Sequence, residues 1–221
     1  MVLSVTDHGE HVYTVDLEPS MHVPYFTPGQ FLHLALDPYE PDGFWPDSRV
    51  FSIASSPDER SLLSITYAVK GAFTTRMERE LTVGSTAWVK LPYGEFVVDP
   101  SRDAVLFAGG TGVTAFTAFL QSLTPEHATR VLLFYGARTA DLFVYGPLAE
   151  ARAREVPALT AHLVCEATHG RLDVDTAWPE MERLVDPVFY LSGPPAMLTA
   201  LSAQLRGRGV DEPSIRTDAW E

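Results

Sequence analysis

The chain has 221 residues, of which 46% are hydrophobic and 20% are charged. This balance is typical of a folded globular protein rather than a disordered one. The formal net charge of −13 repels phosphate backbones, which argues against nucleic acid as a partner. It favours a basic partner protein, although the same charge is also explained by solubility alone.

Cys165 is the single cysteine, so no intrachain disulfide forms and a reducing, cytoplasmic location is expected. An iron–sulfur cluster usually takes four cysteine ligands, so we expect any iron–sulfur partner to be a separate chain. Residues 1–10 are partly charged and hold no long apolar run, so neither a secretory signal nor a membrane span is expected. The histidines are scattered without a close pair, and no metal site is expected.

Short strands with glycine and proline turns dominate the first hundred residues. Alternation of apolar and polar side chains predicts strands at 12–17, 30–36, 50–54, 62–69 and 86–91. A helix is predicted at 74–81, with Thr74 or Thr75 as its N-cap. Residues 38–47 are rich in proline and are expected to form a surface loop. This pattern favours a small antiparallel barrel or sandwich.

Strands and helices alternate after residue 100. Strands are predicted at 104–108, 131–135, 160–165 and 188–191, and helices at 114–123 and 196–206. The first two strands are continuous apolar runs, which indicates burial on both faces of a sheet. Buried parallel strands with crossover helices form a doubly wound sheet. We therefore expect two domains, 1–100 and 101–221.

A glycine-rich turn joins the first of these strands to its helix. It reads Gly109-Gly110-Thr111-Gly112. Glycines at such a turn let the backbone approach a pyrophosphate, and the helix N-terminus adds free N–H groups and partial positive charge. Taken alone, the turn fits dinucleotide binding and a plain tight connection equally well.

A second turn of this kind, Ser192-Gly193-Pro194-Pro195, follows the strand at 188–191. Turns at the carboxyl ends of parallel strands line the crevice in which doubly wound sheets bind ligands. A simple strand-to-helix connection is the alternative. Two such turns in one sheet favour a binding crevice.

Two segments of the first half carry residues suited to a phosphorylated ring compound. Arg49, Phe51 and Ser52 follow one another at the start of a strand and can contact a phosphate, a ring and a heteroatom. Residues 71–75 end a strand and open a helix, which is an arrangement that binds anions. As isolated residues, Phe51 would be core and Arg49 a solvated charge.

The order of these segments resembles the ferredoxin–NADP reductase superfamily over nearly the whole chain. The resemblance implies an antiparallel β-barrel flavin-binding domain followed by an α/β doubly wound nucleotide-binding domain. It implies FAD as the bound cofactor, NADH or NADPH as the hydride donor, and a separate electron acceptor such as an iron–sulfur protein. In that family an Arg-x-Tyr/Phe-Ser strand binds flavin, a Gly-Gly-Thr-Gly turn opens the nucleotide domain, and a Cys-Gly-Pro-Pro turn faces the nicotinamide.

The resemblance assigns the flavin site residue by residue. Arg49 would hold the FAD pyrophosphate, Phe51 would pack on the isoalloxazine, and Ser52 would hydrogen-bond near its N5. The remaining residues implied at the flavin are those lining it and those at the helix start: Tyr67, Val69, Gly71, Phe73 and Thr74.

The resemblance also assigns the nicotinamide site. Ser192 takes the place of the family's cysteine beside nicotinamide C4, and the hydroxyl lacks the polarisable sulfur. Asp218 and Trp220 match the family's ending of an acid and an aromatic. The resemblance implies three candidate catalytic residues: Ser52, Ser192 and Asp218. Trp220 either covers the flavin or packs on the barrel. The residues implied at the dinucleotide are Gly109, Gly110, Thr111, Gly112, Arg138, Glu166, Gly193, Pro194 and Trp220.

Glu166 predicts which nucleotide is used. In NADP-dependent relatives a Ser-Arg pair at this position binds the 2′-phosphate, whereas the pair here is Cys165-Glu166. A carboxylate repels that phosphate and accepts hydrogen bonds from a ribose 2′-OH. NADH is therefore expected to be preferred, although His169 and Arg171 follow closely and can supply compensating positive charge. The alternative is that Glu166 is an exposed loop acid with no role.

Two other functions remain open at this point. A free-flavin reductase shares the Arg-x-Phe-Ser strand and the chain length, but generally lacks the Gly-x-Phe-Thr segment that this chain has at Gly71–Thr74. A non-catalytic electron-transfer subunit of a larger complex is the other alternative.

Overall fold

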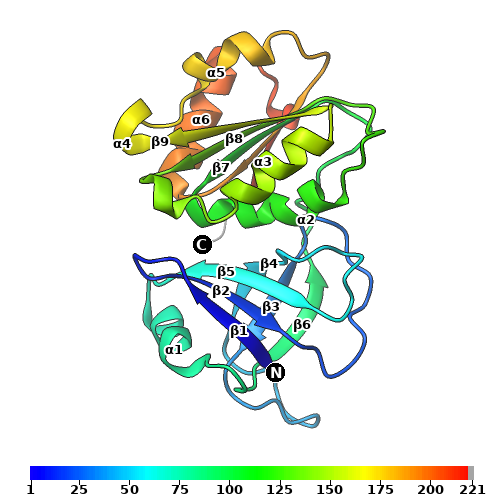
Figure 1. The fold of residues 1–221 in the computed structure, drawn as a ribbon, viewed down its shortest axis with the longest axis vertical. Coiled ribbons are helices and arrows are strands. Elements are labelled where there is room, and N and C mark those ends of the chain that lie inside the picture. The colour runs from blue at the N-terminus through cyan, green and yellow to red at the C-terminus, as the bar shows by residue number, and fades with distance from the viewer. Residues whose placement is uncertain (219–221) are drawn as a thin grey trace.

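A computed structural model describes residues 1–218, and Figure 1 shows them as an antiparallel β unit beneath a parallel α/β unit. The N-terminal unit contains two three-stranded antiparallel sheets. One has the order β1 (Val2–Asp7), β2 (Val12–Leu17) and β5 (Leu63–Ala68), and the other has the order β4 (Ser48–Ser52), β3 (Phe31–Ala35) and β6 (Trp88–Tyr93).

The two sheets enclose one apolar core. Alternate side chains point inward, as a half-buried strand requires, so Val15, Leu32 and Ile65 are completely buried. The Ala54 N–H donates to the Ser64 carbonyl at 2.8 Å, which joins the end of β4 to β5. The predicted antiparallel barrel is confirmed.

Helix α1 (Ala72–Glu80) packs on this core through Phe73 and Met77. It begins two residues before the predicted start, so the prediction of Thr74 or Thr75 as N-cap was wrong. Gly71 is the N-cap, and the Thr74 hydroxyl oxygen accepts the Gly71 N–H at 3.1 Å. A glycine that has no side-chain oxygen can cap this helix because Thr74, inside the first turn, satisfies the backbone donor.

The second unit is a five-stranded parallel sheet. Its order is β11 (Ile215–Asp218), β10 (Val188–Ser192), β7 (Ala104–Gly109), β8 (Val131–Ala137) and β9 (Leu159–Cys165). Both faces are covered, so β7, β8 and β10 carry apolar residues without alternation. The predicted doubly wound parallel sheet is confirmed.

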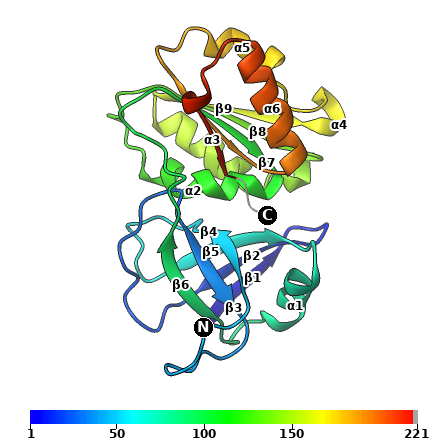
Figure 2. The ribbon, with the colours of Figure 1, turned by 180° about the vertical axis from the view of Figure 1, so that it is seen from behind.

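Two helices cover each face. Helices α2 (Thr114–Ser122) and α3 (Gly146–Glu155) pack on the side of Leu106 and Leu133. Helices α5 (Val174–Met181) and α6 (Pro195–Gly207) pack on the side of Val105 and Leu132, and Figure 2 shows α6 in front of the sheet with α3 behind it. The short elements are η1 (Gly110–Val113), η2 (Ala140–Leu142), α4 (Glu166–His169) and η3 (Glu212–Ser214).

Helix α2 lies at the junction of the two units in both views (Figures 1 and 2). Its Ala118 belongs to the core cluster of the β unit, and Gln121 Nε2 donates to the Ala54 carbonyl at 2.8 Å. On the other side of the junction, the hydroxyls of Thr66 and Tyr145 are 2.8 Å apart. The junction is therefore a packed interface with polar contacts at two places.

Candidate functional site

The two predicted turns of the parallel sheet touch one another. A Cβ on Gly112 would lie 2.4 Å from the Ser192 carbonyl oxygen, and one on Gly193 would lie 3.1 Å from the Gly109 Cα. The first distance is one that real Cβ atoms essentially never show, so the backbone approach at Gly112 requires glycine, and the second is tighter than most Cβ contacts. The carboxyl ends of β7 and β10 therefore form one continuous backbone surface.

The same turn leaves room for a ligand at Gly110. Its φ of +54° is in the left-handed region, and a Cβ there would meet nothing within 4 Å. Thr111 belongs to the same turn, and its carbonyl accepts the Thr114 hydroxyl at 2.7 Å. An exposed glycine turn at the carboxyl edge of a parallel sheet is a fit for a pyrophosphate, whose oxygens need close backbone N–H groups.

The second turn leads directly into helix α6. Pro194 is its N-cap and Pro195 its first residue. Proline is suited to this start because the N–H groups of the first turn have no partner within the helix. The Pro194 Cδ would lie 3.0 Å from a Cβ on Gly109, so the ring packs on the glycine turn.

Ser192 and Asp218 meet at the carboxyl ends of β10 and β11. They are paired in the parallel register, and Ser192 Oγ donates to Asp218 Oδ2 at 3.0 Å. Both side chains are at most 5% exposed. The structure thus brings two predicted catalytic residues into contact in a buried position.

In the β unit, Arg49 and the start of α1 are neighbours. The Arg49 guanidinium lies 5.0 Å from the centre of the Phe73 ring, and it also donates to Asp47 at 2.7 Å and to the Ser48 carbonyl at 2.8 Å. Residue Gly71 has open space around it. A cation beside the free N–H groups of a helix start is a donor set that suits a phosphate.

The predicted ring-binding residues lie on the adjacent strands. Phe51 packs edge-on against Tyr67, with ring centres 6.2 Å apart. Tyr67 is 3% exposed, and burial raises its pKa. Ser52 ends β4 and is half-buried, and the Val69 N–H donates to the His11 carbonyl at 3.0 Å.

Strand β5, which carries Tyr67, contacts η1 and therefore the glycine turn. The flavin-type residues of the β unit and the dinucleotide-type turn of the α/β unit are thus side by side at the junction. Trp220, predicted to cover the flavin or to pack on the barrel, lies outside the described residues.

Arg138 and Glu166 lie at the carboxyl ends of β8 and β9. They are close, because the Ala167 N–H donates to the Arg138 carbonyl at 3.1 Å. Glu166 starts α4 and forms an ion pair of 2.9 Å with Arg171, and this contact raises the pKa of Arg171.

Glu10 is a contact of Arg138 that the sequence did not reveal. Its carboxylate pairs with the Arg138 guanidinium from 128 residues away. No local sequence pattern predicts such a contact, because only the folded junction brings the two residues together. A turn at Gly9 was the single available signal of a tight hairpin at this position.

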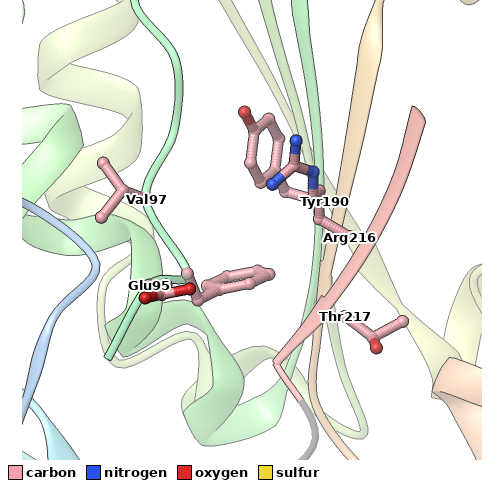
Figure 3. A pocket seen from close by; sticks show the side chains of 6 residues that line it. Glu95, Val97, Tyr190, Arg216 and Thr217 are labelled. Carbon is pink, nitrogen blue, oxygen red and sulfur yellow. The ribbon is translucent and has the colours of Figure 1, made fainter. Parts of the chain in front are cut away.

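A cavity of about 240 Å³ lies between the segment after β6 and the strands β10 and β11, and Figure 3 shows the side chains around it. Its walls come from the segment after β6 and from β10 and β11: Glu95, Phe96, Val97, Tyr190, Arg216 and Thr217. None of these is a predicted site residue. The Phe96 ring meets Tyr190 edge-on, with ring centres 5.8 Å apart, so part of the cavity wall is an aromatic contact between the segment after β6 and β10.

The residues that the structure describes bear on metal binding and on membrane crossing. Across residues 1–218, no group of three or more His, Cys, Asp or Glu is arranged to hold a metal ion. Within the same range, no helix combines the length and apolar character that crossing a membrane requires.

Comparison with known proteins adds to this geometry. Residues 106–203 match the family model of the oxidoreductase NAD-binding domain. Tetrachlorobenzoquinone reductase of Sphingobium chlorophenolicum is 30% identical over 196 residues, which cover 86% of this chain and 57% of that protein. The phenol 2-monooxygenase reductase component DmpP of Pseudomonas sp. (strain CF600) is 30% identical over 227 residues, covering 88% of this chain and 60% of that protein.

Among solved structures, the Amycolatopsis cytochrome P450 reductase GcoB superposes with a TM-score of 0.82 at 24% identity, covering 98% of this chain and 67% of that one. This likeness shows the fold. The chain spans about three fifths of the length of the two curated relatives above.

The fold and site define a class of two-unit oxidoreductases in which an antiparallel barrel precedes a dinucleotide-binding sheet. The family-model match and these relatives agree with the ferredoxin–NADP reductase superfamily that the sequence resembles. The resemblance stated from the sequence is confirmed, and the roles of the individual site residues stay predictions.

Proposed function

We propose that this protein is a flavin-dependent reductase that takes a hydride from a nicotinamide dinucleotide into bound FAD and passes electrons to a separate acceptor. The observation that carries the proposal is the junction. There the Gly109–Gly112 turn, packed on Ser192–Gly193, lies beside the strand of Tyr67. A hydride donor and a flavin need adjacent binding sites because the reacting atoms must approach to roughly 3–3.5 Å.

The flavin phosphates are assigned to Arg49 and the start of α1. The guanidinium stacked on Phe73 supplies positive charge, and the first-turn N–H groups supply neutral donors. Thr74 holds the helix start in place through its bonds to the Lys70 and Gly71 N–H groups. Phe51 and Ser52, on the neighbouring strand, are assigned to the flavin ring.

The dinucleotide is assigned to the crevice at the carboxyl ends of β7, β8 and β10. The Gly109–Gly112 turn binds the pyrophosphate, and the Ser192–Asp218 pair holds the nicotinamide end. Because this pair is buried, it keeps water from the place of reaction and holds the Ser192 hydroxyl in one orientation. The flavin and nicotinamide, when bound, supply the hydride chemistry.

The acceptor is proposed to be a separate protein, such as an iron–sulfur protein. DmpP, named as a reductase component, supports this assignment, and the single cysteine of the sequence is too few for a cluster that usually takes four. The net charge of −13 favours an acceptor with a basic docking face. A cytoplasmic location stays a prediction.

NADH is the proposed donor. Glu166 is placed at the end of β9 and is exposed, where a carboxylate favours a ribose 2′-OH over a 2′-phosphate. Its ion pair with Arg171 engages a guanidinium that lies just after α4.

The test is to purify the chain, desalt it and record its visible spectrum, then follow NADH and NADPH oxidation with ferricyanide as acceptor. The expected result is a yellow protein that retains FAD and oxidises NADH rapidly. A colourless protein that reduces added free flavin would select the free-flavin reductase instead. A yellow protein that oxidises neither nucleotide would select the non-catalytic subunit.

A further inference from the structure

Two arginines and two glutamates form a charge cluster at the carboxyl ends of β8 and β9. Arg138 Nη2 lies 2.5 Å from Glu10 Oε2, and Arg171 Nε lies 2.9 Å from Glu166 Oε1. The Arg138 carbonyl accepts the N–H of Ala167, the residue after Glu166, so the strand ends that carry the two pairs are adjacent. Three members come from the α/β unit, whereas Glu10 reaches across from the β unit.

The hairpin that carries Glu10 is held in an unusual conformation. Gly9, Glu10 and His11 have successive φ values of 81°, 48° and 59°. The left-handed region is unfavourable for residues with a Cβ, at about 1 kcal/mol or more each. A tip that keeps two such residues is retained by contacts elsewhere in the fold.

Those contacts come from Glu78 of α1 and from Val69, which follows β5. His11 Nδ1 lies 2.7 Å from Glu78 Oε1, and the Tyr13 hydroxyl donates to the same oxygen at 2.8 Å. The Val69 N–H also donates to the His11 carbonyl at 3.0 Å. With His11 anchored in this way, Glu10 is presented to Arg138.

The pair is too exposed to serve folding. The Arg138 and Glu10 side chains are 69% and 49% exposed, and ion pairs of this kind contribute little to stability because water screens them. The position of the pair matters more, because dinucleotides bind across the carboxyl ends of parallel strands. The adenosine ribose is recognised there by an acid that binds the 2′-OH or by an arginine that binds the 2′-phosphate.

We infer that Glu10 is a specificity-determining residue that engages Arg138 and so excludes nucleotides with a 2′-phosphate. This inference rests on the proposed dinucleotide crevice. Without Glu10, Arg138 is a free guanidinium at the end of β8, suited to bind a phosphate. With Glu10 in place, that cation is neutralised and a negative charge faces the incoming phosphate. Selectivity at the ribose is thus shared between the two units of the fold.

The experiment compares binding of adenosine 2′,5′-bisphosphate and adenosine 5′-monophosphate, which differ only in the 2′-phosphate, by calorimetry on the full chain. Glu10→Gln is expected to raise affinity for the bisphosphate by about tenfold and to leave affinity for the monophosphate within about twofold. Adding Arg138→Gln to this variant should abolish the gain. The gain should also shrink at high salt.

Glu212→Gln is the matched control. Glu212 forms an ion pair with Arg206, and the two side chains are similarly exposed, at 68% and 51%. This pair lies at the C-terminal end of α6, whereas Pro195 and the proposed crevice lie at its N-terminal end. The control changes the net charge by the same amount and should alter neither affinity.

Three results would overturn the inference. One is a Glu10→Gln protein with unchanged bisphosphate affinity, another is an equal gain for both nucleotides, and the third is a gain that survives Arg138→Gln. In each of these the monophosphate still binds, so the dinucleotide crevice stands while the role of Glu10 fails. Failure of the wild type to bind either nucleotide would remove the crevice, and the proposed function with it.

Discussion

Ser192 donates a hydrogen bond of 3.0 Å to Asp218 Oδ2 across the last two strands of the parallel sheet. The bond orients a buried hydroxyl at the carboxyl end of β10, next to the glycine turn. A serine can perform this task in place of a thiol because it is a strong donor to a carboxylate, whereas a thiol is a weak one.

Ser192→Ala should lower the free energy of unfolding by about 1–3 kcal/mol, because it removes a donor from a buried carboxylate. Flavin reduction by NADH should slow by about tenfold or more through loss of orientation at the nicotinamide end. Thermal melts and stopped-flow at saturating NADH measure the two effects. An unchanged rate in a well-folded Ser192→Ala protein would remove Ser192 from the reaction.

Ser192→Cys should keep or raise the rate of flavin reduction, because a thiol retains a weak donor and adds a polarisable atom. The same stopped-flow experiment on this variant gives the answer. A loss of about tenfold, near 1.4 kcal/mol, would mean that Asp218 requires the hydroxyl.

Arg49→Ala should lose FAD on dilution, with occupancy falling by more than about tenfold, since a charge-assisted phosphate contact contributes about 1.5–3 kcal/mol. The ratio of flavin to protein absorbance after desalting measures the loss. Arg79→Ala is the control, because Arg79 is also exposed, at 69%, but lies in the last turn of α1. Equal flavin retention in the two variants would contradict the assignment.

Gly112→Ala should lower the free energy of unfolding by about 2–3 kcal/mol and weaken nucleotide binding, because the new Cβ overlaps the Ser192 carbonyl. Gly207→Ala, where a Cβ meets nothing within 4 Å, should change stability by less than about 1 kcal/mol. Thermal unfolding of both variants tests the difference. A Gly112→Ala protein as stable as the wild type would show that the two turns do not need their close approach.

NADH should be preferred over NADPH by at least about tenfold, or 1.4 kcal/mol. Glu166→Arg should reduce this preference, because it adds a cation and also releases Arg171 from its ion pair. Steady-state kcat/KM with both nucleotides decides the matter. A wild type that prefers NADPH would contradict the role of Glu166 whatever the variant does.

The pairing of His11 with Glu78 should make the stability contribution of the hairpin depend on pH. The hydrogen bond to Glu78 raises the pKa of His11 above its ordinary 6.5, and the bond to His11 lowers the pKa of Glu78 below its ordinary 4.5. Because the pKa of His11 is raised on folding, its stability contribution is fully present below the pKa of the unfolded chain. That contribution is lost as pH rises through the pKa of the folded protein. Because the pKa of Glu78 is lowered on folding, its stability contribution is fully present above the pKa of the unfolded chain. That contribution is lost as pH falls through the pKa of the folded protein.

The contribution should therefore be largest between roughly pH 4.5 and 6.5. The melting temperature of His11→Gln should fall below that of the wild type at about pH 5.5, and the gap should narrow at about pH 8.5. His22→Gln, at an exposed histidine, serves as the control and should show no such pH dependence. A gap for His11→Gln that widens with pH would reverse the assigned sign.

The fold was largely predictable because its strands carry strong periodic signals. The alternation at 12–17 coincides with β2, and the apolar run at 104–108 lies within β7. Strand β1 and strand β11 were missed. The latter is an edge strand of four residues with two exposed side chains, so it has almost no hydrophobic pattern.

The site was predictable only where a local motif carries it. Both Ser192 and Asp218 were named from the sequence, but their contact follows from β11 lying beside β10, which no local pattern indicates. Glu10 was missed for the same reason, because its partner Arg138 belongs to the other unit. Thr74 was misplaced as a cap because Gly71, which lacks a side chain, gives no N-cap signal.

Ala118 links the two units more tightly than their separate sheets suggest. This residue of α2 is fully buried among the side chains of the β unit, so pulling the units apart would expose apolar surface on both. The chain is therefore expected to unfold in a single cooperative transition rather than one unit at a time. The distance between the proposed flavin site and the proposed dinucleotide crevice would then be set when the chain folds.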